Sequence, residues 1–467
     1  MSHTRAPRDA RSPRWMRPLH IASLLAATAC LAACATQPRY QKPAIEVQAA
    51  WANAPAGIEA VLPRVAAEER WWTQLNDPAI DTLVAAGLTD SPTLAQAAAR
   101  VDEARATLNV SRAQRLPQLT GNASATRATN QNTQSIGSAS TIRSDSASVG
   151  ATLGWELDLW GRARATQHAA HSRLDARNAD ANGARLSLVA QIADGVLNLR
   201  ACNYSLAVRD QDIASRETEL ALMRQRLAAG NVAEVDEANA SGNLASARTN
   251  RLSQQEQCAL IVDALVALSG RDAATIRNLV AQPLVATQTA AADGAPPLPI
   301  TQVSAASVMP SAPLTQPALP ASVLREHPSV QSAEREVAAS WSEIGVARAD
   351  RLPRVDLSAL LTGQWIRAFG STVHFDTWSV GPALSVPVFD GGSGAATVRG
   401  AEARYRNALA TLRSTLRTAA QDVEDALAVQ QSAEQRISTS QQAVDAGRVA
   451  LRANEASRGE RSSSDTN

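Results

Sequence analysis

Residues 91–119, SPTLAQAAARVDEARATLNVSRAQRLPQL, recur in altered form as residues 327–355, HPSVQSAEREVAASWSEIGVARADRLPRV. One offset of 236 residues superimposes Pro92 on Pro328 and aligns the two Arg-Leu-Pro triplets without a gap. Self-similarity at a fixed offset is the signature of a repeated structural element. The chain is therefore predicted to consist of two tandem repeats.

A second match carries a period of two. SVGATLGW from Ser148 matches SVGPALSV from Ser379 at an offset of 231, so an insertion lies between the two matches. In SVGATLGWELDLW the apolar residues occupy every second position and the residues between them are small or polar; the apolar ones are Val149, Ala151, Leu153, Trp155, Leu157 and Leu159. This alternation predicts a strand with one apolar and one polar face.

Each repeat is predicted to hold the same elements in the same order. A helix with an apolar stripe at three- and four-residue spacing comes first and ends at a proline. Two strands and a long helix follow; the strands are expected at about 118–128 and 147–159, and at about 355–366 and 377–389, with the helices at 161–229 and 392–458. The segments TNQNTQSIGSASTIRSDS and RAFGSTVHFD are expected as hairpin loops. Helices of this length, roughly 100 Å, indicate a coiled-coil cylinder.

The composition limits the classes of protein. A net charge of +1 over 467 residues gives no reason to expect nucleic acid as a partner. Apolar residues make up 45% but aromatic residues only 3%, which suits helices packed through small side chains. After residue 34 no uncharged apolar run is long enough for a spanning helix, so membrane passage would use strands. Four strands are too few for a pore, whereas three chains would supply twelve.

The first 34 residues predict export and lipid attachment. A basic stretch is followed by a 13-residue apolar run, Ile21–Ala33, which is typical of a signal peptide. Leu-Ala-Ala-Cys, ending at Cys34, resembles the bacterial lipobox, which implies that residues 1–33 are removed and Cys34 carries lipid. By the same resemblance, Ala35 favours sorting to the outer membrane. A signal peptide without lipidation is the alternative.

Several motifs together resemble one family. They are RYQKP (39–43), WWTQLNDPAID (71–81), WELDLWGR (155–162), RQRLAAGNVAEV (224–235) and LPASVLREHPSVQSAE (319–334). They are similar to those of TolC/OprM-like outer-membrane factors, in particular the lipidated NodT-type efflux lipoproteins. The resemblance implies a mainly α fold with a membrane β-barrel portion, and a homotrimer that combines a twelve-stranded barrel with a periplasmic α-helical barrel.

The resemblance also implies partners and organisation. A periplasmic adaptor and an inner-membrane pump of the resistance-nodulation-division type would complete the system, with outer-membrane lipid around the barrel. The expected segments are a signal peptide (1–33), a lipidated segment (34–77), the first repeat (78–280), a Pro/Ala/Thr-rich linker (281–319), the second repeat (320–459) and a disordered tail (460–467). The second repeat lacks a returning helix, so its long helix is expected to expose an apolar stripe, with weakened trimer assembly or a leaky periplasmic end.

The resemblance assigns roles to a few residues. Arg226 and Gly230 match the periplasmic hairpin tip that faces the adaptor; the alternative for Arg226 is a solvated helix residue. Repeat spacing adds Gly459 to this tip, and it places Glu455 and Arg458 near the closed end as candidate gate residues.

Cys202 and Cys258 each lie 28 residues from Gly230, so an antiparallel hairpin would hold them at similar height. A disulfide and two separate buried thiols are both compatible with this spacing.

No catalytic or cofactor motif is found: GxSxG, GxxxxGK[ST] and HExxH are absent from the sequence. His168 and His171 are interpreted as an exposed polar pair rather than a metal site. The favoured function is passive export of drugs or other small molecules through the outer membrane. A secretion duct for proteins or oligosaccharides and a structural coiled-coil lipoprotein of the periplasm are the alternatives, and an enzyme is not expected.

Overall fold

The computed structural model describes residues 40–44, 48, 50–54, 70–132, 140–282 and 320–464. These residues form two units. The sheet unit comprises the described residues of Met1–Ala44, Asp102–Ala176 and Ser332–Ser414; the core unit comprises those of Ile45–Val101, Arg177–Gln331 and Thr415–Asn467. The predicted signal peptide, Cys34 and nearly all of the predicted linker lie outside the described residues.

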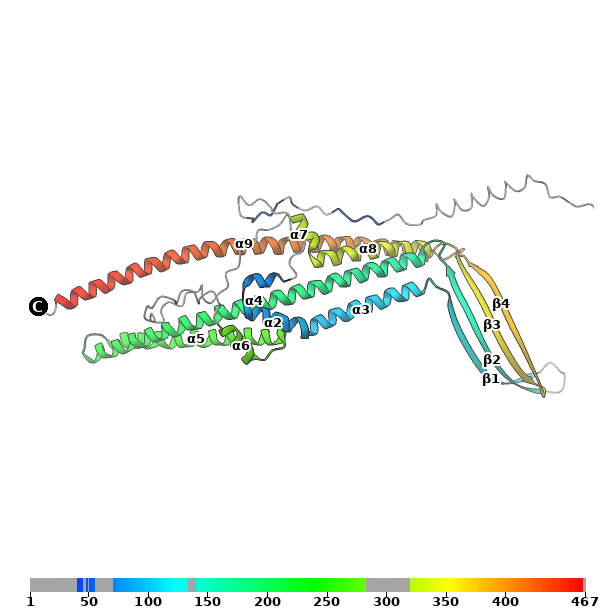
Figure 1. The fold of residues 1–467 in the computed structure, drawn as a ribbon, viewed down its shortest axis with the longest axis horizontal. Helices are drawn as coiled ribbons and strands as arrows, with labels where there is room; N and C mark the ends of the chain where they lie inside the picture. Colours follow the sequence, from blue (N-terminus) through cyan, green and yellow to red (C-terminus); the bar gives the residue numbers. More distant parts are fainter. Residues whose placement is uncertain are drawn as a thin grey trace, which may run out of the picture. The chain divides into compact units, whose positions relative to one another are not determined.

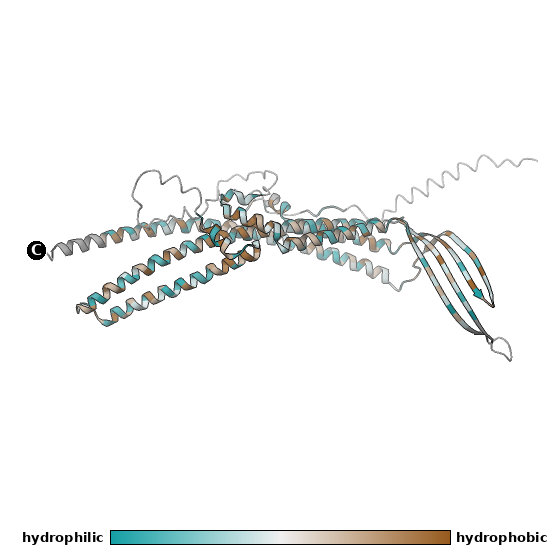
Figure 2. Cartoon of the chain, turned by 60° about the horizontal axis from the view of Figure 1, so that its bottom comes forward, coloured by the Kyte–Doolittle hydropathy of each residue, from teal (hydrophilic) through white to brown (hydrophobic). Residues whose placement is uncertain are grey.

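The sheet unit contains one antiparallel sheet in the order β1-β2-β3-β4 (Figure 1). The strands are β1 (Gln118–Asn132), β2 (Ser140–Leu157), β3 (Arg354–Ala368) and β4 (Ser371–Ser385). Each repeat supplies one hairpin, and β2 pairs with β3 to join the two hairpins. Polar and apolar residues alternate along the strands (Figure 2). The prediction of two strands per repeat is confirmed.

The strand register reproduces the repeat found in the sequence. Gln118 pairs with Gly154 in the first hairpin, and the corresponding pair in the second hairpin is Arg354 with Ser385. Seven residues, 133–139, connect β1 to β2, whereas two residues connect β3 to β4. This difference of five residues accounts for the change of offset from 236 to 231.

The second hairpin loop is much shorter than predicted. RAFGSTVHFD was expected to be a loop because of its polar residues, but β3 continues to Ala368 and β4 begins at Ser371. Only Phe369 and Gly370 form the turn, and both have positive φ, 52° and 78°. Positive φ at both central residues gives a turn whose twist matches that of the flanking strands. All four strands therefore extend further toward the hairpin turns than expected. At the end near the helices, β4 stops four residues earlier than expected.

The helices repeat with the strands. Helices α3 (Pro92–Ala113) and α8 (Pro328–Ala349) precede the hairpins, and each is 22 residues long. The long helices α4 (Arg162–Ala228) and α9 (Ser393–Ser464) follow them. The predicted end of α9 before Gly459 is wrong, because the helix continues through this glycine and into the predicted disordered tail. An isolated glycine costs a helix only about 1 kcal/mol relative to alanine, too little to end it.

The core unit is built from helices. Helix α5 (Glu234–Ser269) returns along α4, and the short helices α2 (Pro78–Asp90) and α6 (Ala273–Ala281) pack onto this pair (Figure 1). The remaining short elements are η1 (Trp71–Leu75) and α7 (Pro320–Glu326). Within the described ranges, none of the helices combines the length and the apolar character needed to cross a bilayer.

Small residues bring the core helices close together, as the composition predicts. The apolar residues of lowest exposure include Ile80, Leu83, Ile192, Leu265 and Ile276. At Gly195 of α4, an added Cβ would lie 2.8 Å from Cδ2 of Leu265 on α5, which is closer than side chains pack. The glycine that interrupts the helical pattern in the sequence therefore permits the contact between α4 and α5.

Candidate functional site

The register of the four strands sorts their side chains onto two faces. We call one the apolar face: it carries Leu119, Val149, Ala151, Leu153, Trp155, Leu357, Ala359, Leu361, Trp378, Val380 and Leu384. We call the other the polar face: it carries Thr120, Asn122, Ser124, Ser148, Thr152, Ser358, Thr362, Thr377 and Ser379. Trp378 is 75% exposed on the apolar face. A sheet of this kind has a large apolar surface that the described residues do not cover.

The apolar face has a measurable extent along β2 and β3. It begins at the row of Leu157 and Val355 and reaches the row of Ala147 and Trp365, whereas on β4 the same face already carries Asp376, opposite Gly363. Ten residues at about 3.4 Å per residue give about 34 Å along β2. A strand tilt of about 45° reduces this length to a height of about 24 Å, which matches the apolar band of about 25 Å on membrane barrels.

The apolar face ends in a row of charges at the edge farthest from the helices. Arg127 donates two hydrogen bonds to the Asp145 carboxylate, from Nε at 2.6 Å and from Nη2 at 3.0 Å. Arg367 lies opposite Asp145 on the neighbouring strand, and Arg143 follows two residues along β2. We call this edge, defined by Arg127, Arg143 and Arg367, the distal rim.

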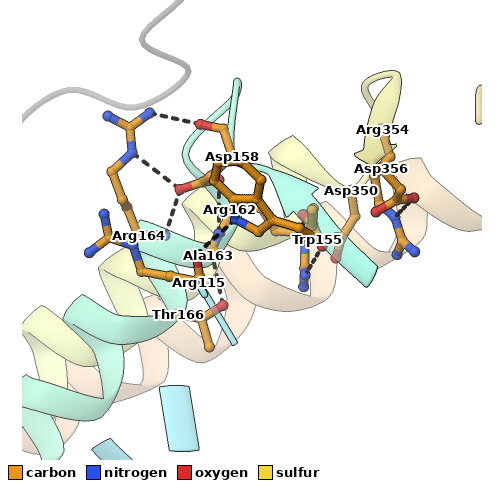
Figure 3. A network of polar contacts seen from close by, with 11 residues as sticks. Arg115, Trp155, Asp158, Arg162, Ala163, Arg164, Thr166, Asp350, Arg354 and Asp356 are labelled. Atoms are coloured by element: carbon orange, nitrogen blue, oxygen red, sulfur yellow. Dashed lines mark hydrogen bonds and ion pairs between the residues drawn. The ribbon is translucent and has the colours of Figure 1, made fainter. Parts of the chain in front are cut away.

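The opposite end of the sheet joins the long helices through a network of polar contacts (Figure 3). The Asp158 carboxylate accepts hydrogen bonds from the backbone N–H groups of Ala163 at 3.0 Å and Arg164 at 2.9 Å. Gly161, with φ +81°, makes the bend between strand and helix. A carboxylate at this position satisfies free N–H groups and complements the helix dipole. The WELDLWGR motif therefore encodes the change from strand to helix.

Ion pairs stiffen the same junction. Arg162 bonds both oxygens of Glu156, at 2.8 Å and 2.5 Å, and these hydrogen bonds raise the pKa of the Arg162 guanidinium. Trp155 Nε1 donates to the Arg115 carbonyl at 3.0 Å and so ties β2 to the segment that precedes β1 (Figure 3).

The second repeat begins its long helix in a similar way. The Asp390 carboxylate accepts hydrogen bonds from the N–H groups of Gly394 at 2.7 Å and Gly392 at 2.8 Å, and these bonds lower the pKa of Asp390.

The helical hairpin ends in a regular turn at the predicted tip. Gly230 has φ +75°, its N–H donates to the Leu227 carbonyl at 2.9 Å, and the N–H of Asn231 donates to the Arg226 carbonyl at 2.8 Å. These two bonds form a Schellman motif, which ends a helix at a glycine. The Arg226 side chain is exposed in the last turn of α4. The structure thus brings Arg226 and Gly230 together at the hairpin end.

The other predicted tip and gate residues are not at a turn. Glu455, Arg458 and Gly459 all lie within α9, and their side chains are outside the described part of the structure. Earlier in the same half of α9, several apolar side chains are exposed: Val429, Ile437, Val444, Val449 and Leu451. The expected apolar stripe on this helix is therefore present.

The two cysteines of the core unit form a disulfide between α4 and α5. The Cα atoms of Cys202 and Cys258 are 5.7 Å apart, within the usual range for a bridge. Both side chains are buried in the helical core. Of the two arrangements that the sequence left open, the structure contains the disulfide.

A buried ion pair in the core unit was not predicted from the sequence. Arg200 bonds both oxygens of Asp77, at 2.7 Å and 2.9 Å, and donates to the carbonyls of Val280 at 2.9 Å and Gln282 at 3.1 Å. Asp77 also accepts from the N–H of Ala79 at 2.9 Å and so caps α2. The Asp-Pro pair at a helix start was the only available signal, and it does not reveal the partner.

The described residues contain no group of three or more His, Cys, Asp or Glu side chains placed to hold a metal ion. His171 instead lies 3.4 Å from the carboxylate of Asp175, one helical turn away.

Comparisons with known proteins agree with these features. The sequence model of one family, described as Outer membrane efflux protein, matches residues 83–271 and 319–460. Outer membrane protein OprJ of Pseudomonas aeruginosa is 30% identical over 417 residues, covering 88% of this chain and 81% of OprJ. Nodulation protein T of Rhizobium leguminosarum bv. trifolii is 27% identical over 402 residues, covering 86% of this chain and 80% of that protein. The solved structure of the outer-membrane channel OprN has a TM-score of 0.69 and 27% identity, covering 86% of this chain and 84% of the OprN chain.

Proposed function

The chain belongs to the outer membrane efflux protein family, and we propose that it acts as a homotrimeric export duct in a tripartite pump. It is an outer-membrane efflux channel, a transport protein by family. The proposal concerns its assembly, its partners and its cargo. One observation supports it. The sheet has an apolar face about 24 Å high, and its four strands are too few to close into a pore.

The edges of the sheet support assembly from several copies. Within the described residues, β1 and β4 each pair on one side only. An open strand edge cannot stay unpaired in hydrocarbon, because its N–H and C=O groups would have no partners. Pairing β4 of one copy with β1 of the next removes both edges. Three copies would give twelve strands, enough for a barrel that encloses a passage.

The polar face is suited to line this passage. Its side chains are mostly hydroxyls and amides without charge, and two of them, Ser124 and Ser148, are joined by a hydrogen bond of 2.8 Å. Such a lining offers water-like contacts to many small polar and amphipathic molecules. This supports passive export of drugs or other small molecules without chemical change.

The remaining parts of the proposal concern the ends of the duct. Arg226 and Gly230, at the ordered turn between α4 and α5, would face a periplasmic adaptor that connects to an inner-membrane pump of the resistance-nodulation-division type. Lipid on Cys34 would anchor the N-terminal segment to the outer membrane. A purely structural lipoprotein of the periplasm would have no use for an apolar face of membrane height.

The test uses two adjacent residues of β2 on opposite faces. Ser148→Cys places a thiol on the polar face, and Val149→Cys places one on the apolar face. Full-length protein in a planar bilayer should conduct in both variants. A bulky, charged methanethiosulfonate reagent should reduce the conductance of Ser148→Cys strongly and leave that of Val149→Cys unchanged.

The control is wild-type protein treated with the same reagent, because it contains the native cysteines. Absence of conductance in wild-type protein, or a block through Val149→Cys alone, contradicts the proposed duct. Native mass spectrometry of the same preparations should show three copies of the chain.

A further inference from the structure

The distal rim differs in charge from the rest of the apolar face. Arg127, Asp145 and Arg367 occupy one row across β1, β2 and β3, and Arg143 lies on the same face two residues further along β2. Between this row and the helices, β1, β2 and β3 carry no charged residues until the junction with the helices. There Glu156 and the other charged junction residues lie on the polar face. The rim therefore marks where the apolar band ends on β1, β2 and β3.

The rim carries more positive than negative charge. Asp145 is engaged by Arg127 through two hydrogen bonds. Arg143 and Arg367 are exposed and make no ion pair or hydrogen bond of their side chains within the described part of the chain.

Two titratable groups on β4 face the same side. Asp376 lies opposite Gly363 and His374 opposite Trp365, closer to the helices than the rim. Asp376 is therefore one row closer to the helices than Trp365, and it forms no ion pair with Arg143 or Arg367.

The position of these arginines selects their partner. Ionised side chains avoid the hydrocarbon region and settle where headgroups begin. The guanidinium group is planar and matches two oxygens of a phosphate with parallel hydrogen bonds. A surplus of guanidinium at the end of an outward-facing apolar band therefore fits a lipid whose acyl chains cover the band and whose headgroup carries phosphate.

We propose that Arg143 and Arg367, steadied by the Arg127–Asp145 pair, bind the phosphate groups of an anionic lipid in the leaflet that meets the distal rim. This inference rests on the proposed function, because it requires the apolar face to lie in a membrane. Trp365, next to Arg367 on the membrane side of the rim, lies where interfacial aromatic residues are commonly found. The lipid would hold the outer end of each hairpin at a fixed depth.

The experiment measures lipid retained by the full-length protein in detergent. Diphosphoryl lipid A is the probe, and the same lipid with its phosphates removed is the chemical control. Bound lipid is counted by native mass spectrometry over a range of lipid concentrations. The test variant is Arg143→Gln with Arg367→Gln. The matched variant, Arg406→Gln with Arg436→Gln, removes two exposed arginines from α9 instead.

Each arginine near an anionic lipid surface raises the binding affinity several-fold, so the loss of two arginines should weaken lipid binding at least tenfold. We expect wild-type protein and the α9 variant to bind diphosphoryl lipid A equally, and both to prefer it over the dephosphorylated lipid. Replacement of both rim arginines by lysine should retain an intermediate affinity. Equal binding by the rim variant and the α9 variant, or equal binding of the two lipids by wild type, overturns the inference.

Conductance separates this inference from the proposed function. The rim variant should still form channels in planar bilayers, because neither arginine lies on the polar face. If wild-type protein forms channels but its lipid binding does not depend on phosphate, the lipid site is contradicted and the proposed duct is not. A wild-type protein that forms no channel would instead remove the duct itself.

Discussion

The core unit buries its apolar side chains, whereas the sheet unit exposes many of its own. In the core unit Ile192, Leu265 and Ile276 have no exposed surface, and in the sheet unit Leu119 and Trp378 are more than 70% exposed. Burial of apolar surface is the main favourable term in folding. The helical core therefore gains its stability within one chain, whereas the described residues leave the apolar face of the sheet and its two outer strand edges uncovered.

Two enclosed polar groups differ in whether they are hydrogen-bonded. The guanidinium of Arg200 is buried in the core unit with four hydrogen bonds, two to Asp77 and two to backbone carbonyls. In the sheet unit, the hydroxyl of Tyr40 is enclosed and has no hydrogen-bond partner within the described residues. Substitutions at these two residues should therefore have very different costs.

The largest expected effect is that of Arg200→Ala. It would leave the Asp77 carboxylate buried, 1% exposed, without its counter-charge. Breaking a buried pair on one side typically costs about 3–5 kcal/mol in the free energy of unfolding. Denaturant unfolding followed by helical circular dichroism would measure this loss.

The double substitution Arg200→Met with Asp77→Leu is the matched control for the buried pair. Replacing both charges by apolar groups removes the unpaired carboxylate, so the double variant should be more stable than Arg200→Ala. A double variant that is less stable than Arg200→Ala would show that the packing of these side chains, rather than the buried charge, determines the cost.

The second prediction concerns the disulfide of the core unit. The bridge between Cys202 and Cys258 spans 56 positions of the chain. Closing a loop of this size restricts the unfolded chain, and its loss typically costs about 2–4 kcal/mol. The double substitution of both cysteines by alanine should show this loss in denaturant unfolding, and added reductant should then have no further effect. Thiol labelling of denatured wild-type protein should modify Cys202 and Cys258 only after reductant is added, which would confirm that the bridge is formed.

The third prediction tests the outward-facing apolar surface of the sheet. Leu361→Arg places a charge in the middle row of the apolar face, and Leu360→Arg places the same charge on the polar face of the same strand. A charged residue at the midplane of the lipid-facing surface costs about 2–4 kcal/mol, whereas a charge toward water costs little. Insertion into lipid vesicles should fall for Leu361→Arg and remain near wild type for Leu360→Arg. Equal insertion of both variants would mean that the apolar face does not contact lipid.

Much of the sheet and its helices could be predicted because the signals are local or repeated. The alternation in SVGATLGWELDLW defines which side chains share a face, and the 236-residue repeat predicts a matching second hairpin. The turn at Gly230 was also predictable, since glycine favours the backbone conformation at this helix end. Each of these signals lies within a few residues of the feature that it predicts.

The features that escaped prediction depend on distant pairings. Asp77 and Arg200 are 123 residues apart, and no local pattern links them. The disulfide could not be decided because equal distances from Gly230 give the height of two cysteines along a hairpin but not the direction in which their side chains point. Strand ends were missed because polar residues at a membrane edge resemble a loop. At the turn of the second hairpin, Phe369 has a positive φ, but its residue type does not indicate a turn.

The smallest expected effect comes from Tyr40, whose hydroxyl forms no hydrogen bond within the described residues. Burial and the nearby charge of Glu334 raise the pKa of Tyr40 to about 12. The folded state therefore keeps this proton at a pH where the unfolded chain, with an ordinary pKa near 10, releases it. The contribution of Tyr40 to stability is fully present below about pH 10 and is lost as the pH rises toward 12.

Tyr40→Phe should remove this dependence on pH. It should leave stability at neutral pH unchanged or slightly higher, because it deletes a hydroxyl that forms no hydrogen bond. Ultraviolet absorbance of tyrosinate, recorded against pH, should show a step near 12 in wild-type protein that is lost in Tyr40→Phe. A measurable loss of stability at neutral pH on this substitution would mean that the hydroxyl of Tyr40 forms a hydrogen bond in the assembled protein.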